Sequence, residues 1–79
     1  MKLTYDPTHN VAYISLKDKP AEVETIRVSA DLNVDIAPDG TVYGIELLNA
    51  NEQLAGVHHG ELLVVNEASG RSSSVKLPA

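Results

Sequence analysis

Hydrophobic and polar residues alternate along most of the chain in short stretches, and each stretch ends in a cluster of turn-forming residues. A period of two places successive side chains on opposite faces of a strand, so the pattern predicts a mainly β fold. Clusters of turn-forming residues recur about every 8–12 residues, which is the spacing of an antiparallel β domain. Five strands are expected before residue 50, at 2–5, 11–16, 22–28, 32–37 and 41–48.

Three of these stretches carry further information about the sheet. In the second, Ala12 and Ile14 share one face, but Val11 and Tyr13 on the other face are also apolar. A strand that is apolar on both faces is expected at the centre of a sheet or beneath a partner. The alternation slips in the third stretch, which predicts an edge strand or a β-bulge. Gly44, in the middle of the fifth, predicts the close approach of another backbone or a large side chain.

The last third of the chain predicts one short helix and a hairpin. Asn49 and Glu52 have the spacing of a capping box, in which Asn49 caps the first turn, and Gly56 can end the helix. Residues 61–67 are predicted to form a strand of the buried type. The polar stretch 71–77 is predicted to be its edge partner or a frayed tail.

The predicted fold is therefore mainly β, bordering on α+β. It comprises an antiparallel meander of five strands, one short helix near residues 50–55 and a C-terminal hairpin. A chain of 79 residues has room for one domain. We expect a single small domain, 1–79, with the meander in 1–50 and the helix and hairpin in 51–79.

The core residues available to this domain are aliphatic, with 9 Val, 9 Leu and 4 Ile but no Phe or Trp. Burial in so small a core barely offsets the entropy of ordering the chain, so a lone copy should be marginally stable. The absence of Cys excludes disulfides and thiolate metal sites. A partner subunit is the remaining source of burial. We expect a homodimer, packed through the faces that carry Val11 and Tyr13 or edge to edge.

The formal charge of −5 argues against nucleic acid as a partner, since phosphate binding needs clustered Lys and Arg. A basic protein is the partner that this charge favours. No stretch approaches the roughly 20 apolar residues of a membrane span, and the polar start is unlike a signal peptide, so we expect a cytoplasmic protein. The acidic surface is expected to comprise Glu22, Glu24, Asp31, Asp35 and Asp39.

Two segments carry a resemblance to a known family. The first is KLTYDPTHNVAYISL, with Tyr5-Asp6-Pro7 spaced from Tyr13, and the second is LNVDIAPDGTVYGIELLNA, which ends in residues 44–50. Over roughly residues 1–50 the chain resembles the domain of unknown function numbered 2283, a family of small bacterial and archaeal proteins. Asn10 stands where members commonly carry an acidic residue. The resemblance implies a small cytoplasmic protein of this β fold and no established activity.

Four residues are candidates for a ligand-binding site: Asp6, Tyr13, Tyr43 and Glu46. Glu46 lies among apolar neighbours, where a partly buried carboxylate can act as a general base or hold a cationic partner. A structural carboxylate is the alternative interpretation. Asp6 is most simply an Asx-turn residue, and the tyrosines are most simply core or dimer-interface residues.

His58 and His59 are the weak candidates for a metal site, but adjacent residues of an extended chain point apart and a third ligand would be needed. We therefore predict no metal site and no cofactor. No catalytic residues are predicted, because no nucleophile–base motif occurs.

The sequence thus favours a non-enzymatic, dimeric protein-interaction module, for example an antitoxin-like protein that neutralises a basic toxin. The alternative is a small ligand-binding or enzymatic module. It would use Glu46, Asp6 and Tyr or His residues in a pocket at the dimer interface.

Overall fold

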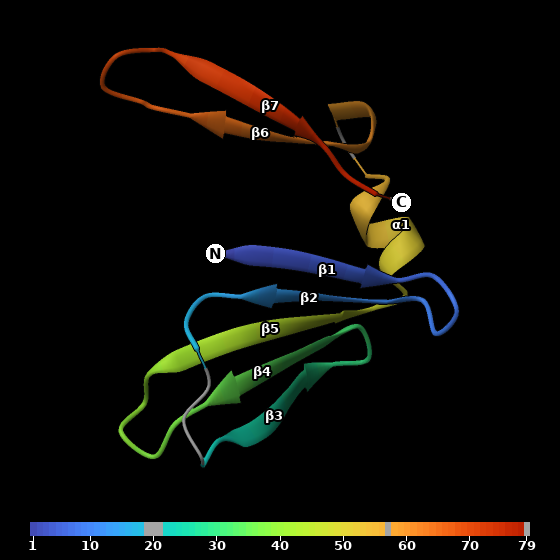
Figure 1. The fold of residues 1–79 in the computed structure, drawn as a ribbon, viewed down its shortest axis with the longest axis vertical. Coiled ribbons are helices and arrows are strands. Elements are labelled where there is room, and N and C mark those ends of the chain that lie inside the picture. The colour runs from blue at the N-terminus through green and yellow to red at the C-terminus, as the bar shows by residue number, and fades with distance from the viewer. Residues whose placement is uncertain (19–21, 57, 79) are drawn as a thin grey trace.

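The computed structural model describes residues 1–18, 22–56 and 58–78, and it contains one five-stranded sheet and one two-stranded sheet (Figure 1). The strands of the larger sheet are β1 (Lys2–Asp6), β2 (Val11–Ser15), β3 (Glu24–Ser29), β4 (Leu32–Ile36) and β5 (Val42–Leu48). After β5 come helix α1 (Ala50–Leu54), the 3₁₀ turn η1 (His58–Gly60) and the hairpin strands β6 (Glu61–Val65) and β7 (Ser72–Lys76).

The larger sheet is antiparallel throughout, with the strand order β1-β2-β5-β4-β3. This confirms the five-stranded antiparallel sheet, the short helix and the C-terminal hairpin. The order differs from a sequential meander, because β2 pairs with β5 rather than with β3. Strand β2 therefore lies inside the sheet, between β1 and β5, as the apolar residues on both sides of its sequence pattern predicted. Strand β3 is an edge strand, and its irregularity lies between Arg27 and Ser29.

The pairing register gives the sheet one apolar face. Across all five strands, directly opposed residues form a row that we call the central apolar row: Leu3, Ile14, Ile45, Val34 and Ile26. A second apolar row beside it runs through Tyr5, Ala12, Leu47 and Leu32. Since side chains alternate along each strand, the residues between these rows lie on the opposite face of the sheet.

Helix α1 is fastened to the turn between β1 and β2. The Asn10 side-chain oxygen accepts the backbone N–H of Asn51 at 2.8 Å, and the Asn10 carbonyl accepts the N–H of Ala50 at 3.0 Å. Asn49 is the N-cap residue, but its side chain makes no capping bond and instead donates to the Glu52 carboxylate at 2.9 Å. The predicted capping box is therefore wrong: the capping oxygen comes from Asn10, which the sequence pattern did not reveal.

The buried core lies at one end of the apolar face. Ala12 of β2 and Ala50 and Leu54 of α1 form its centre, and partly buried side chains pack around them, namely Leu3, Tyr5, Leu47 and Leu77. Helix α1 is five residues long, so it covers the apolar face only around Ala12. The far end of the apolar face, towards β3 and β4, has no such cover from α1 (Figure 1).

The hairpin β6–β7 lies beyond the β1 edge of the sheet and is separated from it in Figure 1. The Cα radius of gyration is 14.0 Å, whereas a compact domain of this length has about 12 Å. In the part of the chain that the structure describes, no helix has the length and apolar character to cross a membrane.

Candidate functional site

The polar face of the sheet brings together two of the four predicted site residues. Tyr13 of β2 lies directly opposite Glu46 of β5, which in turn lies opposite Asn33 of β4. The neighbouring row runs from Ser15 through Gly44 and Asp35 to Thr25. The candidate site is therefore a patch of polar side chains at the centre of the sheet rather than a set of loops.

Asp35 is the anchor of this patch. The Tyr13 hydroxyl donates to one of its carboxylate oxygens at 2.7 Å, and the Thr25 hydroxyl donates to the other at 2.6 Å. Asp35 is only 8% exposed, and a buried polar group left without a hydrogen-bond partner costs free energy. A buried carboxylate needs such partners, so the three side chains tie strands β2, β4 and β3 together.

Gly44 provides the space in which Tyr13 reaches Asp35. A Cβ built on Gly44 would overlap the hydroxyl and ring of Tyr13, so the ring lies against the bare backbone of β5. The predicted close approach at this glycine is thereby confirmed, and the approaching group is the Tyr13 side chain.

Glu46 is half-buried and accepts a hydrogen bond from the Asn33 side-chain amide at 2.8 Å. This cross-strand pair joins β4 to β5 in the same way that Tyr13 and Asp35 join β2 to β4. Glu46 thus has the geometry of a structural carboxylate. It can also present negative charge on a face that already carries Asp35.

Asp6 lies at the end of β1 and belongs to the first turn rather than to the central patch. One carboxylate oxygen accepts the backbone N–H groups of Thr8 at 2.9 Å and His9 at 3.3 Å, and the other is 2.7 Å from Nδ1 of His9. The pKa of Asp6 is lowered, chiefly by the hydrogen bond from the His9 ring. The backbone N–H groups of His9 and Thr8 and the charge of the His9 ring lower this pKa further. These bonds are those of the predicted Asx turn.

The remaining candidates lie elsewhere. Tyr43 precedes Gly44 by one residue and so lies on the opposite face from Tyr13 and Glu46. His59 is exposed in the turn before β6, while the side chain of His58 is outside the described residues. Within 1–18, 22–56 and 58–78, no three His, Cys, Asp or Glu residues come together as metal ligands.

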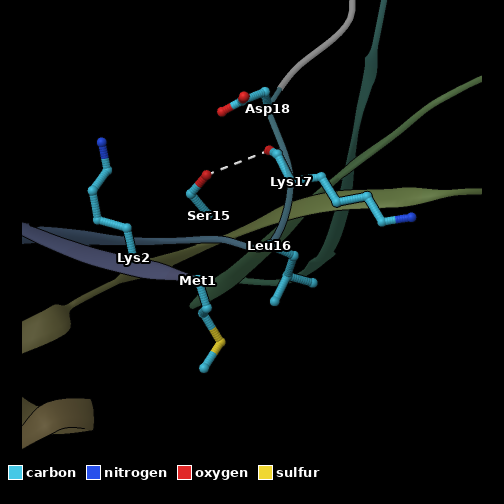
Figure 2. A pocket seen from close by; sticks show the side chains of 6 residues that line it. All are labelled: Met1, Lys2, Ser15, Leu16, Lys17 and Asp18. Atoms are coloured by element: carbon cyan, nitrogen blue, oxygen red, sulfur yellow. Dashed lines mark hydrogen bonds between the residues drawn. The ribbon is translucent and has the colours of Figure 1, made fainter.

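A shallow hollow of about 390 Å³ lies where β1 begins and β2 ends, but it contains none of the predicted site residues. Figure 2 shows the Lys2 and Lys17 amines pointing in different directions, with Ser15 donating to the Lys17 carbonyl at 3.4 Å. The side chains of Met1 and Leu16 point to the other side of the strands. The hollow therefore does not direct its charged groups to a common point.

Sequence reasoning missed Asp35, Thr25 and Asn33 as members of the polar patch. Asp35 was expected on the exposed acidic surface, and its burial corrects that expectation. The signal that could have placed it is the register: Asp35 pairs with Gly44, whose missing side chain lets a tyrosine from the next strand reach across.

The fold and the polar face define a class of small, mainly β proteins with a five-stranded antiparallel sheet, apolar on one face and hydrogen-bonded on the other. The family described as "Protein of unknown function (DUF2283)" matches residues 2–51, from β1 into α1. Because this match spans more than half of the 79 residues, the chain belongs to that family, as its resemblance predicted. The hairpin β6–β7 lies outside the matched segment. Neither the curated proteins nor the solved structures give a match to the chain.

Replacing Gly44 with Ala should destabilise the protein by about 1–3 kcal/mol, because the added methyl group overlaps Tyr13. Urea unfolding followed by circular dichroism measures this. Gly56→Ala is the matched control, since a Cβ there would make an ordinary contact of 3.6 Å with the Gln53 carbonyl. In a Tyr13→Ala background the cost of Gly44→Ala should largely disappear. An equal cost in both backgrounds would contradict the tyrosine–glycine contact.

Replacing His9 with Ala should raise the pKa of Asp6 towards its ordinary value of 3.8. The folded-state pKa of Asp6 is depressed, so its turn stabilises the fold above the unfolded pKa and loses that contribution as pH falls through the folded pKa. An NMR titration of the side-chain carboxyl groups reads this directly. Asp39 is the internal control, because the backbone N–H of Thr41 lowers its pKa and His9 is not among the causes. A common shift of Asp6 and Asp39, or none in Asp6, would argue against the His9 contact.

Proposed function

We propose that this protein is a homodimeric protein-interaction module with no catalytic activity of its own. The observation that carries the proposal is the amount of apolar surface that a single chain leaves uncovered. Large hydrophobic side chains are exposed in the described residues on β3 and on both hairpin strands: Ile26, Val28, Leu62, Leu63, Val64, Val65 and Val75.

The exposed area can be compared with that of an ordinary monomer. The chain exposes 5732 Å², while a compact monomer of 8.5 kDa exposes about 4,650 Å². The excess of about 1,100 Å² is comparable to the surface that one partner buries in a stable interface, about 800 Å² or somewhat more. A second copy of the chain would be large enough to bury this excess surface.

The layering of the molecule supports the same proposal. A domain normally consists of two packed layers, because a sheet with one apolar face must bury that face against another element. Here α1 supplies a second layer over one end only. A partner subunit would supply the rest over the face of the central apolar row, where Ile26 at the β3 edge is 43% exposed. This differs from the Val11 and Tyr13 face considered from the sequence, which carries the hydrogen-bonded polar patch.

The polar face supports a structural rather than a catalytic role for its side chains. Asp35 accepts bonds from Tyr13 and Thr25, and Glu46 accepts a bond from Asn33, so each carboxylate is bonded to a neighbouring strand. The Tyr13 and Thr25 hydroxyls both donate to the carboxylate of Asp35, so these bonds link strands β2 and β3 to β4.

Charge favours a basic protein as the outside partner of the module, for example a small basic toxin. The chain carries 11 Asp and Glu against 6 Lys and Arg. With Asp35 buried, the expected acidic surface consists of the exposed residues Glu22, Glu24, Asp31 and Asp39. Of these, Asp31 lies in the β3–β4 turn and Asp39 in the β4–β5 turn, at opposite ends of β4.

A tagged chain, co-expressed in its native cells with an untagged copy, should retain the untagged copy and a basic protein in stoichiometric amounts. The basic protein should dissociate as salt is raised, because exposed charges are screened. Glu24→Lys with Asp39→Lys should lose the basic protein, whereas the control Glu67→Lys, in the distant hairpin turn, should keep it. Recovery of the tagged chain alone would contradict the proposal, and a mass of 8.5 kDa in solution would contradict the homodimer.

The alternative function is a ligand-binding or enzymatic module, and the half-buried Glu46 beside Tyr13 is the observation that favours it. Glu46→Gln should separate the two functions. The variant keeps an oxygen to accept the bond from Asn33, so it should fold with nearly unchanged stability in a urea titration. The interaction module predicts that Glu46→Gln retains its partner. A folded variant that has lost its partner would instead favour a binding role for the Glu46 carboxylate.

A further inference from the structure

The hairpin β6–β7 has one apolar face that a single chain leaves open. Leu62 lies opposite Val75, and Val64 lies opposite Ser73, so Leu62, Val64 and Val75 share that face. Their exposed fractions are 44%, 51% and 57%. The opposite face carries Leu63 and Val65, which are paired with Ser74 and Ser72, and it also carries the charged pair Glu61 and Lys76, so it is more polar. Two strands by themselves are marginally stable in water, so this hairpin needs a surface to pack on.

The root of the hairpin is fixed near α1, where Leu77 packs against the core and its N–H donates to the Gly60 carbonyl at 2.9 Å. An apolar hollow of about 320 Å³ lies between this root and the sheet. It is lined by Met1, Leu3, Ile14, Leu54, Leu62 and Leu77. The Leu62 face of the hairpin and the face of the central apolar row therefore border the same hollow and form one concave apolar surface.

The hairpin cannot cover the far end of its own sheet from this position. It lies beyond β1, and β3 is at the opposite edge (Figure 1). Four strand spacings separate β1 from β3, which is about 19 Å. Ile26 of β3, which ends the central apolar row, is 43% exposed as a result.

We propose that the hairpin is an exchanged arm: its Leu62, Val64 and Val75 face lies on the central apolar row of a second copy of the chain. A two-fold axis makes the contact reciprocal, so each sheet receives the partner's hairpin. One contact then covers both exposed surfaces, whereas packing the two sheets face to face would leave both hairpins open. This inference rests on the proposed homodimer and specifies its geometry.

Engineered cysteines test this geometry, because the chain contains no Cys of its own. Val64→Cys with Ile26→Cys should form a disulfide between subunits, seen as a doubled mass on non-reducing electrophoresis after mild oxidation. A disulfide requires Cα atoms within about 7 Å, so the pair cannot close within one chain across the width of the sheet. Val65→Cys with Ile26→Cys is the matched control, since Val65 lies on the other face of the hairpin, and it should crosslink much less.

Two outcomes of the crosslinking would overturn the exchanged arm while leaving the homodimer intact. One is efficient crosslinking of Val64→Cys alone, which would mean that the two hairpins contact each other. The other is a dimer in light scattering that the Val64–Ile26 pair fails to crosslink. A monomer in light scattering would overturn both the exchanged arm and the homodimer.

A second pair of variants tests the same contact without oxidation. Val75→Asp should raise the dimer dissociation constant at least about tenfold, because it places a charge in an aliphatic contact. Ser74→Asp, one position along on the opposite hairpin face, should leave the constant within a few-fold. Both side chains are exposed in a single chain, so both variants should keep the wild-type circular dichroism. Equal effects of the two variants would contradict the exchanged arm.

Discussion

The structure depends on one constraint: a five-stranded sheet with an apolar face needs a second layer, and in the described residues the α-helix that packs on it, α1, is five residues long. Ala50 and Leu54 seal the end of the face at Ala12, which is where the small core forms. Ile26, at the β3 edge of the central apolar row, and the hairpin strands stay exposed in one chain. The proposed homodimer and the proposed exchanged arm both follow from this mismatch between the sheet and its cover.

The opposite face of the sheet meets a different requirement, because polar groups there are partly shielded from water and must find partners within the sheet. Gly44 leaves room for Tyr13, Tyr13 reaches Asp35, and Thr25 completes the connection to the edge strand. These bonds couple strands that are distant in sequence. The hydrogen bonds of the polar patch therefore hold β2, β3 and β4 in register.

The residues that sequence reasoning placed well are those whose signal is local. The Asx turn at Asp6, the central position of β2 and the close approach at Gly44 each follow from a few neighbouring residues. Two others depend on long-range register. Asn10 caps a helix some 40 residues away, and Asp35 becomes buried only because β4 pairs with β5 opposite Gly44. No local pattern distinguishes such an Asp from the exposed acids of a strand.

The sequence alone determined the mainly β fold, the strands, the short helix and the hairpin, because alternation and turn residues act over a few positions. It also determined that the chain is acidic and has few large hydrophobic residues with which to build a core. Tertiary structure decided the strand order, and with it which side chains share a face. The order sets which residues are neighbours across strands, so it separated Asp6 and Tyr43 from Tyr13 and Glu46. It also placed Ile26 at the exposed edge of the central apolar row.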